Sequence, residues 1–372
     1  MKKLAVTCSK EMLMENINYV SRMASSRTTL PILECILLIA DEDSGISLIA
    51  NDLEMGIVTA MIPSDVETGG TVALDAKLFA DIVRRLPDDA VYIEADENNI
   101  TRIYSGRTEF TILGLNGEEF PQLPQVDKNQ AYEISASLFK NMIRQTIFSV
   151  SMDDTKPILT GQLMSIQNNT MDLVAVDGFR VSYVKHELEG KNANTSVVVP
   201  AKTLHEISRI IPTDSDENLC IYVTERHAMF EMKKFTMVSR LLEGDFIKYN
   251  QVLNSDYTTK VLANRQLLLS SLERASLISK ESKKEPVKLS LHKDMLSIDS
   301  KTQMGSFTDE IAVDIDGNDL EIAFNPKYWI DVLKVIEDDE VTMIFTTALS
   351  PCIIQPVAEG NYKYLILPLR LK

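Results

Sequence analysis

The chain has 372 residues, and its 38 Lys and Arg against 54 Asp and Glu give a formal net charge of −16 at pH 7. This length suits two or three domains, and an apolar content of 45% excludes a disordered chain. The acidic balance argues against a protein that coats nucleic acid through bulk charge, although it is compatible with a local basic surface.

The apolar run at the start of the chain is too short for a secretion signal. We predict a β-strand there instead, as the first element. A helix is expected at 9–23, where Leu13, Ile17 and Val20 recur at helical spacing. A second helix is expected at 75–86, between two groups of strands. Alternating apolar segments predict those strands at 36–40, 46–50, 91–95 and 100–104. Further helices are expected at 136–150, 200–211, 263–280 and 325–336.

The chain repeats itself at an interval of about 125 residues. Lys77, Lys202 and Lys327 are each 125 residues apart, and each is followed by an acid four residues on and a base three residues further. Asp52 and Asp177 keep the same interval. This period is too long for a solenoid, so each repeat is expected to be a domain in its own right. We predict three tandem homologous domains at 1–126, 127–253 and 254–372.

Each predicted domain combines two helices with hairpins and short links, which indicates an α+β fold of helices packed on antiparallel sheets. The six predicted helices together hold fourteen bases and seven acids, so the rest of the chain carries a net charge of −23. One interpretation is a set of solvated helix faces with salt bridges. The other, favoured by the threefold recurrence, is a common surface that faces a polyanion and contacts phosphates without reading sequence. The bases that recur are Lys77, Arg84, Lys202, Arg209, Lys327 and Lys334.

Signs of catalysis, cofactors and membrane insertion are missing from the sequence. There is no phosphate-binding loop, no dinucleotide-binding glycine motif, no HExxH and no GxSxG. No apolar run reaches the ~18 residues of a membrane span. The four cysteines are far apart with no CxxC pair, which is typical of reduced thiols in a cytoplasm and not of a zinc site or a disulfide framework. We therefore expect a cytoplasmic protein that is not an enzyme and that binds no metal or cofactor.

Four segments together resemble one family over the full length of the chain. They are Arg-Thr-Thr-Leu-Pro-Ile-Leu at 27–33, Asn-Asp-Leu-Glu-Met at 51–55, Val-Asp-Gly-Phe-Arg at 176–180 and Leu-Pro-Leu-Arg-Leu at 367–371. In this order, and with the threefold repeat, they resemble the bacterial DNA polymerase III beta subunit, the sliding clamp. The resemblance implies a head-to-tail homodimer whose six domains close into a ring, with helices inside and sheets outside. Such a ring encloses double-stranded DNA without sequence preference and tethers a polymerase.

The resemblance also implies partners and the residues that meet them. It adds Arg27 to the DNA-binding residues and supports Lys202. It places Phe110 and Ile112 of the first domain against Leu277 and Ile278 of the third domain in the dimer. The DNA polymerase III alpha subunit, the clamp loader and other proteins with a clamp-binding motif would insert a peptide between the second and third domains. The residues expected to hold that peptide are Leu159, Val176, Gly178, Phe179, Arg180, Val181, Ile247, Val252, Pro351, Leu365, Ile366, Leu367, Pro368, Leu369, Arg370 and Leu371.

Several positions depart from the family pattern, namely Phe179, Ile247, Gln251 and Ala201. They keep open a specialised clamp paralogue with a different peptide preference or looser DNA contact. A second alternative is a monomeric scaffold that binds peptides and never encloses DNA. A third is an enzyme with a site in one domain seam, against which the threefold repetition argues.

Overall fold

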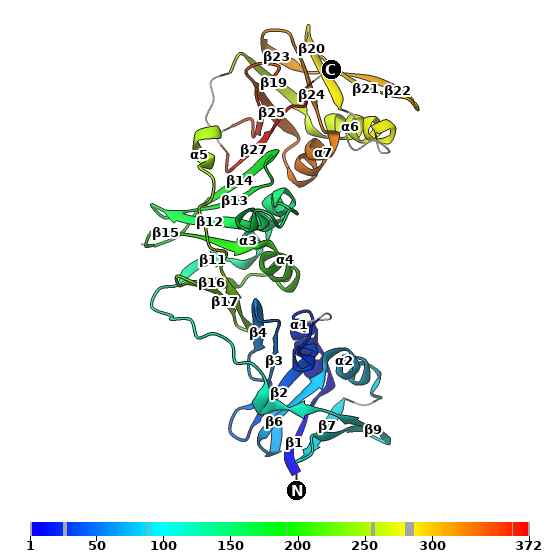
Figure 1. Cartoon of the computed structure of the whole chain (residues 1–372), viewed down its shortest axis with the longest axis vertical. Coiled ribbons are helices and arrows are strands. Elements are labelled where there is room, and N and C mark those ends of the chain that lie inside the picture. Colours follow the sequence, from blue (N-terminus) through cyan, green and yellow to red (C-terminus); the bar gives the residue numbers. More distant parts are fainter. Residues whose placement is uncertain are drawn as a thin grey trace. The chain divides into compact units, whose positions relative to one another are not determined.

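The computed structural model describes residues 2–24, 28–87, 89–190, 192–253, 257–279, 286–358 and 360–370. The chain forms two compact units, one of Met1–Ser137 with Arg209–Leu241 and the other of Leu138–Ser208 with Leu242–Lys372 (Figure 1). This division cuts the predicted central domain at three points, after residues 137, 208 and 241. The strands of that domain are therefore shared between the two units.

The first unit holds two antiparallel sheets. The five-stranded sheet has the order β5-β1-β7-β8-β9, and the nine-stranded sheet has the order β10-β6-β2-β3-β4-β18-β17-β16-β11. The first sheet is made of β1 (Lys2–Ser9), β5 (Ser64–Thr68), β7 (Ala90–Asp96), β8 (Ile100–Ser105) and β9 (Thr108–Leu113). The second is made of β2 (Cys35–Asp41), β3 (Gly45–Asn51), β4 (Met55–Thr59), β6 (Gly70–Asp75), β10 (Leu115–Asn116), β11 (Tyr132–Ser135), β16 (Asn218–Val223), β17 (His227–Met232) and β18 (Phe235–Arg240).

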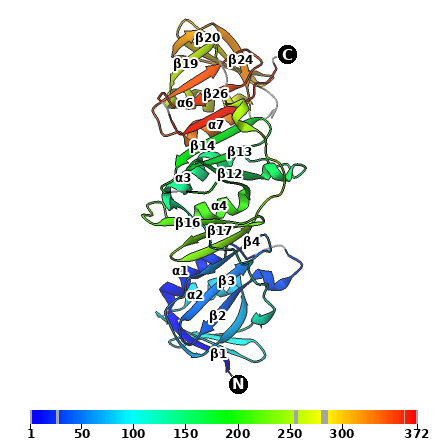
Figure 2. The same ribbon diagram turned by 90° about the vertical axis from the view of Figure 1, so that its left-hand side faces the viewer.

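Two helices, α1 (Lys10–Val20) and α2 (Ala76–Arg85), lie side by side in this unit, as Figures 1 and 2 show. Their predicted ranges of 9–23 and 75–86 are confirmed to within three residues. Leu13 is among the fully buried residues of α1, as its helical spacing predicts. Asp75 caps α2 by accepting a hydrogen bond of 2.7 Å from the backbone N–H of Leu78, which satisfies a donor at the helix start.

The second unit also holds two antiparallel sheets. Their orders are β15-β12-β13-β14-β27-β26-β25-β19-β23 and β22-β21-β20-β24. The larger sheet is made of β12 (Gly161–Gln167), β13 (Thr170–Val176), β14 (Arg180–Glu187), β15 (Thr195–Pro200), β19 (Thr259–Asn264), β23 (Asp314–Gly317), β25 (Glu340–Phe345), β26 (Cys352–Gln355) and β27 (Tyr362–Ile366). The smaller sheet is made of β20 (Val287–His292), β21 (Met295–Thr302), β22 (Gly305–Ala312) and β24 (Leu320–Phe324).

The remaining predicted helices are also confirmed, as α3 (Ala136–Thr146), α4 (Ala201–Ile210), α6 (Arg265–Ser279) and α7 (Pro326–Val335). In the second unit α6 packs on α7 and on β21 and β22. A four-residue helix, α5 (Tyr249–Val252), was not predicted, because one turn is too short to leave a periodic pattern in the sequence. Among the described residues, no helix is both long and apolar enough to cross a membrane.

Hairpin turns set the register of the paired strands. Asn168 and Asn169 between β12 and β13 both have positive φ, of 51° and 63°. Lys293 and Asp294 between β20 and β21 have φ of 48° and 60°. Two successive left-handed residues make the tight turn that matches the twist of antiparallel strands, so each of these pairs closes a hairpin.

Strands of successive repeats pair directly with each other. In the first unit β4 pairs with β18, and in the second unit β14 pairs with β27. An unpaired strand edge is a template for pairing with other chains, and these two junctions remove four such edges. The repeats are therefore joined through continuous sheets. For this reason each compact unit contains strands from two neighbouring repeats.

Candidate functional site

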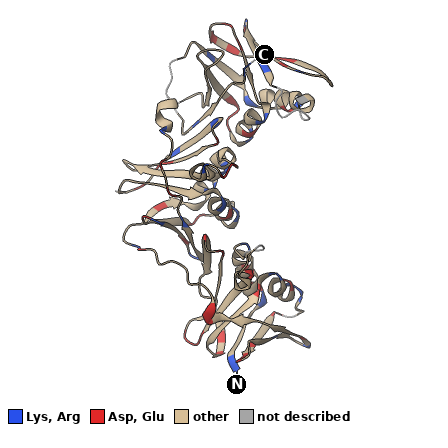
Figure 3. Cartoon of the chain, in the orientation of Figure 1, with Lys and Arg blue, Asp and Glu red and all other residues tan. Residues whose placement is uncertain are grey.

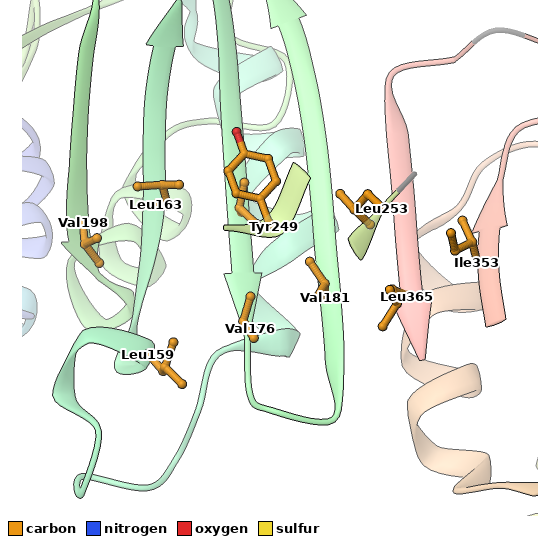
Figure 4. Close-up of a cluster of buried hydrophobic side chains, with 10 residues drawn as sticks. Leu159, Leu163, Val176, Val181, Val198, Tyr249, Leu253, Ile353 and Leu365 are labelled. Atoms are coloured by element: carbon orange, nitrogen blue, oxygen red, sulfur yellow. The ribbon is translucent and has the colours of Figure 1, made fainter. Parts of the chain in front are cut away.

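A cluster of buried apolar side chains lies in the second unit, where β14 of one repeat meets β27 of the next. We call it the seam cluster. Figure 4 shows its members projecting from the 3-10 turn Pro157–Thr160, from β12, β13, β14 and β15, from α5 and the residue after it, and from β26 and β27. It consists of Leu159, Leu163, Val174, Val176, Val181, Val198, Tyr249, Leu253, Ile353 and Leu365. Four of the residues predicted to hold a peptide, Leu159, Val176, Val181 and Leu365, are thus brought together in one core.

Large apolar side chains of the same predicted set are exposed. Phe179 is 55% exposed, Val252 46%, Ile247 39% and Leu367 37%. The backbone N–H of Leu367 donates a hydrogen bond of 2.9 Å to the carbonyl of Phe179, which places the two residues side by side. Ile247 and Val252 flank Tyr249 of the seam cluster. Exposed apolar side chains close to a buried apolar cluster are typical of a surface that binds another chain.

The turn before β14 directs Phe179 outward. One carboxylate oxygen of Asp177 accepts hydrogen bonds from the backbone N–H groups of Phe179, at 2.9 Å, and Arg180, at 3.0 Å. Gly178 between them has a φ of +91°, in the left-handed region that favours glycine. A Cβ at this glycine would meet no atom within 4 Å, so the backbone conformation, and not space, requires the residue.

Arg180 is buried, and each of its three guanidinium nitrogens donates a hydrogen bond. Its Nε donates to Asp177 at 2.9 Å, one Nη donates to Asp331 of α7 at 2.7 Å, and the other donates to the carbonyl of Phe148 at 2.5 Å. Its Cζ also lies 4.6 Å from the ring centroid of Tyr328. Arg180 therefore holds the turn of Asp177 against α7, and its own hydrogen-bond donors face inward.

The segment after β27 is attached by backbone hydrogen bonds. Leu369 donates through its N–H to the carbonyl of Ala323, at 2.7 Å. Ile366 is fully buried, Pro368 and Leu369 are half-buried, and Arg370 is exposed. Leu371 lies outside the described residues. Pro351, just before β26, is half-buried.

The recurring bases lie on the second helix of each repeat, which carries blue segments in Figure 3. Lys77, Lys202 and Lys327 are exposed, and each is the second residue of its helix, α2, α4 or α7. The other base of each set, Arg84, Arg209 or Lys334, lies in the last turn of the same helix. Arg84 pairs with Asp81 at 2.8 Å, and Lys334 pairs with Glu273 of α6 at 2.9 Å. Arg27 lies outside the described residues.

The residues predicted for the dimer lie on two surfaces that each include a sheet edge. Phe110 and Ile112 are half-buried on β9, the last strand of the five-stranded sheet. Leu277 is 63% exposed and Ile278 half-buried on α6, which packs on β22, the last strand of the four-stranded sheet.

A polar group that was not predicted from the sequence lies next to the seam cluster. Asp172 on β13 accepts a hydrogen bond of 2.7 Å from the hydroxyl of Tyr249 and one of 3.0 Å from the hydroxyl of Tyr183 on β14. Burial raises the pKa of Asp172, and it also raises the pKa of each tyrosine hydroxyl. Asp is uncommon in β-strands, and Asp172 lies in a mostly apolar one. Its presence there was the only feature of the sequence that could have indicated this polar group.

The described part of the chain offers little evidence for a metal site or a reactive thiol. No three His, Cys, Asp or Glu side chains there are grouped so that they could hold a metal ion. Cys8, Cys35, Cys220 and Cys352 are free thiols. Burial raises the pKa of Cys35 to about 11, which makes this thiol a poor nucleophile.

Three family models and full-length relatives match the chain. The models describe the N-terminal, central and C-terminal domains of the DNA polymerase III beta subunit, and they match residues 4–124, 133–248 and 250–370. The beta sliding clamp of Bacillus subtilis (strain 168) is 35% identical over 376 residues, which cover 98% of this chain and 99% of that protein.

Solved structures of similar proteins have the same fold. A putative DNA polymerase III beta subunit from Eubacterium rectale has a TM-score of 0.96 and 41% identity, covering 99% of this chain and 100% of that one. The DNA polymerase sliding clamp of Bacillus subtilis has a TM-score of 0.96 and 34% identity, covering 100% of each chain. Because all three domain models match in order and a relative matches over its whole length, the chain belongs to the DNA polymerase III beta subunit family of sliding clamps.

Proposed function

We propose that this chain is a DNA sliding clamp, a processivity factor that encircles duplex DNA and tethers a DNA polymerase. Relatives that match it over the full length are named beta sliding clamps, and none of those names describes a catalytic activity. The protein thus acts as a processivity subunit and not as an enzyme. The proposed location is the cytoplasm, in keeping with the free cysteines.

The observation that carries DNA binding is the position of the recurring lysines. Lys77, Lys202 and Lys327 each occupy the second residue of a helix, where the partial positive charge of the helix dipole disfavours a cation. Helix stability therefore does not account for their recurrence. An anionic ligand does account for it, because a lysine and a helix N-terminus both attract phosphate.

Encirclement reconciles these lysines with a net charge of −16. A few phosphate contacts per helix give weak attraction without sequence preference, while the acidic remainder repels DNA from the outside. Weak contacts also suit sliding, because strong neutralisation of many phosphates would stop movement along the duplex. We propose Arg27, Lys77, Arg84, Lys202, Arg209, Lys327 and Lys334 as the DNA-facing bases.

Ring closure requires a second copy of the chain. The proposed dimer joins the edge strand β9, with Phe110 and Ile112, to the partner's surface that matches α6 and β22 here, with Leu277 and Ile278. A head-to-tail contact of this kind closes into a ring when the rotations sum to a full turn, and it would also cover two sheet edges. In this proposal the domains are 1–126, 127–253 and 254–372 of each copy.

Partners bind at the seam cluster and its exposed neighbours. We propose that the DNA polymerase III alpha subunit, the clamp loader and other clamp-binding proteins insert an extended apolar peptide against Phe179, Ile247, Val252 and Leu367. A mostly apolar surface with few polar groups suits such a peptide. Arg180 contributes by fixing the turn that carries Phe179, since its donors are already engaged.

The test of encirclement compares circular with linear DNA. The chain is loaded onto nicked circular duplex with a clamp loader and ATP, and the complex is isolated by gel filtration. We expect the clamp to stay on the intact circle and to leave after a single restriction cut. A linear duplex whose two ends are blocked by bound protein serves as the control and should retain it. Retention on linear DNA with free ends would contradict the encircling mechanism.

A further inference from the structure

The carboxylate of Asp172 anchors one short segment of the chain. Tyr249 of α5 is 7% exposed, and its hydroxyl donates to Asp172 at 2.7 Å. Among the described residues, the other hydrogen bonds of residues 247–253 stay within that segment. The contact with Asp172 therefore connects α5 to the β-sheet through a polar interaction. A hydrogen bond to a charged acceptor is stronger than one between neutral groups, and it is more directional than apolar packing.

The repeat shows that the fold does not need this polar group. In the second unit Asp172 pairs with Ser165 across β12 and β13, and in the first unit Ser47 pairs with Ile39 across the equivalent strands β2 and β3. Ser47 thus takes the place of Asp172, at the interval of 125 residues.

The two tyrosines are replaced in the same way. Tyr183 pairs with Val174 in the second unit, and at the same interval Val58 pairs with Ile49 in the first unit. The position of Tyr249 is taken by Leu123, one interval of 126 residues earlier. The first repeat builds its sheet without a carboxylate or a tyrosine at these positions. The polar group is therefore present in the central repeat, which contributes Phe179, Ile247 and Val252 to the proposed peptide site, and absent from the first repeat.

The anchored segment bears two of the exposed residues of that site. Ile247 precedes Tyr249 by two residues and Val252 follows it by three, and they are 39% and 46% exposed. Figure 4 shows Tyr249 lying over the strands that carry Val176 and Val181, so its ring forms part of the seam cluster. A displacement of Tyr249 would move both exposed side chains together.

We propose that Asp172 is a positioning residue for peptide binding: it accepts the hydrogen bond from Tyr249 and so holds Ile247 and Val252 in place as one wall of the peptide site. The inference rests on the proposed function of this site. A preformed wall avoids the cost of ordering α5 when the peptide binds, so the anchor contributes to affinity through preorganisation.

The experiment compares two tyrosine variants that each remove one hydroxyl from the same carboxylate. Tyr249→Phe breaks the bond that holds α5, whereas Tyr183→Phe breaks a bond between the paired strands β14 and β13 and serves as the matched control. The probe is a fluorescein-labelled synthetic hexapeptide with a Leu-Phe pair at its C-terminal end, titrated against the full chain by fluorescence anisotropy. Melting temperature and solution mass are measured for every variant.

We expect Tyr249→Phe to weaken binding of the probe about tenfold, and Tyr183→Phe to leave it within about twofold. Asp172→Asn keeps one acceptor oxygen without the charge, so it should weaken binding less than Asp172→Ala does. Hydrogen exchange of residues 246–253 in the free chain should rise in Tyr249→Phe and not in Tyr183→Phe.

Equal effects of the two tyrosine variants on binding would overturn the inference, because they would assign the group a general structural role. Unchanged binding in Tyr249→Phe would also overturn it. If the wild-type chain does not bind the probe, the proposed peptide site is wrong and the positioning role falls with it. The exchange rates of residues 246–253 still separate that failure from a failure of the anchor itself.

Discussion

At the scale of single residues, the second unit contains two charged groups, the buried Arg180 and the half-buried Asp172, that are satisfied in different ways. Arg180 meets two carboxylates and a carbonyl, so its charge is compensated by opposite charge. Asp172 receives only hydroxyl groups as hydrogen-bond donors, while Lys185, opposite it on β14, lowers its pKa slightly. Burial outweighs these effects, and the pKa of Asp172 is raised. Ionised Asp172 therefore costs folding free energy, as positioning residues often do.

This cost predicts how the stability of Asp172→Asn depends on pH. A raised pKa means that the folded chain binds the proton more tightly than the unfolded chain, so this group's contribution to stability is lost as the pH rises from the ordinary pKa of an aspartate through the raised value. Asparagine does not titrate and escapes this loss. We expect the melting temperature of Asp172→Asn, relative to wild type, to increase as the pH rises through the raised pKa of Asp172 and then to level off, as measured by calorimetry.

Asp153 supplies a control of opposite sign. Hydrogen bonds from the backbone N–H and side chain of Thr155 lower the pKa of this exposed carboxylate. Its contribution to stability is present above the ordinary pKa and is lost as the pH falls through the lowered value. Asp153→Asn should thus be less stable than wild type at pH 7, and the difference should close on acidification. The same pH trend in both variants would contradict the assignment of Asp172.

At the scale of elements, the second helix of each repeat has a basic residue near both ends. Arg84, Arg209 and Lys334 lie in the last turn, where a cation interacts favourably with the helix dipole. Those positions therefore have a structural explanation as well as a functional one. The helix dipole gives no such explanation for Lys77 and its two equivalents at the helix starts, so these lysines distinguish between a solvated helix face and a DNA-binding surface.

We predict that combining Lys77→Ala, Lys202→Ala and Lys327→Ala weakens DNA binding without lowering stability. Removing these lysines should leave the melting temperature unchanged or slightly raised. The plot of log affinity for duplex DNA against log salt concentration should become shallower by about 0.9 for each phosphate that the variant no longer neutralises. Fluorescence anisotropy with a labelled duplex measures both the affinity and the slope.

Lys288 on β20 provides the control for this variant. It pairs with Glu321 at 3.1 Å and is half-buried in a strand whose other face is buried. Lys288→Ala should leave the salt dependence unchanged. If the triple variant binds DNA with the wild-type slope, the lysines belong to a solvated face and the proposed DNA surface is wrong.

At the scale of the whole molecule, the proposed function depends on assembly. Leu277 and Leu267 are both exposed leucines of α6, by 63% and 56%, and only Leu277 belongs to the predicted dimer surface. Exposure in the single chain means that a charge at either position costs little folding free energy. The same charge inside a dimer interface would be desolvated without a partner, which is strongly unfavourable.

We therefore predict that Leu277→Asp converts a dimer into a chain of 41.8 kDa, whereas Leu267→Asp keeps twice that mass. Sedimentation equilibrium at micromolar concentration measures the mass of each variant. Leu277→Asp should also abolish retention on circular DNA, because an open chain cannot enclose a duplex. A dimeric Leu277→Asp would exclude this surface from the interface.

The features that were predicted correctly from the sequence are those that depend on local patterns. The six long helices, the hairpins and the α+β class follow from spacing and turn chemistry within short stretches, and all of them are present. The residue boundaries at 126 and 253 stay a prediction. The short helix α5 was missed because a single turn carries no periodic signal.

By itself, the sequence determined the threefold repeat, the location of the bases on the helices and the family, because each of these is written in local order or in regular intervals. Only the tertiary structure decided that Arg180 faces inward to Asp331, and that Asp172 holds Tyr249. The physical reason is distance along the chain: these partners lie 151 and 77 residues apart. Such contacts arise only when β14 meets β27 and α5 folds over β13, and no local pattern records that.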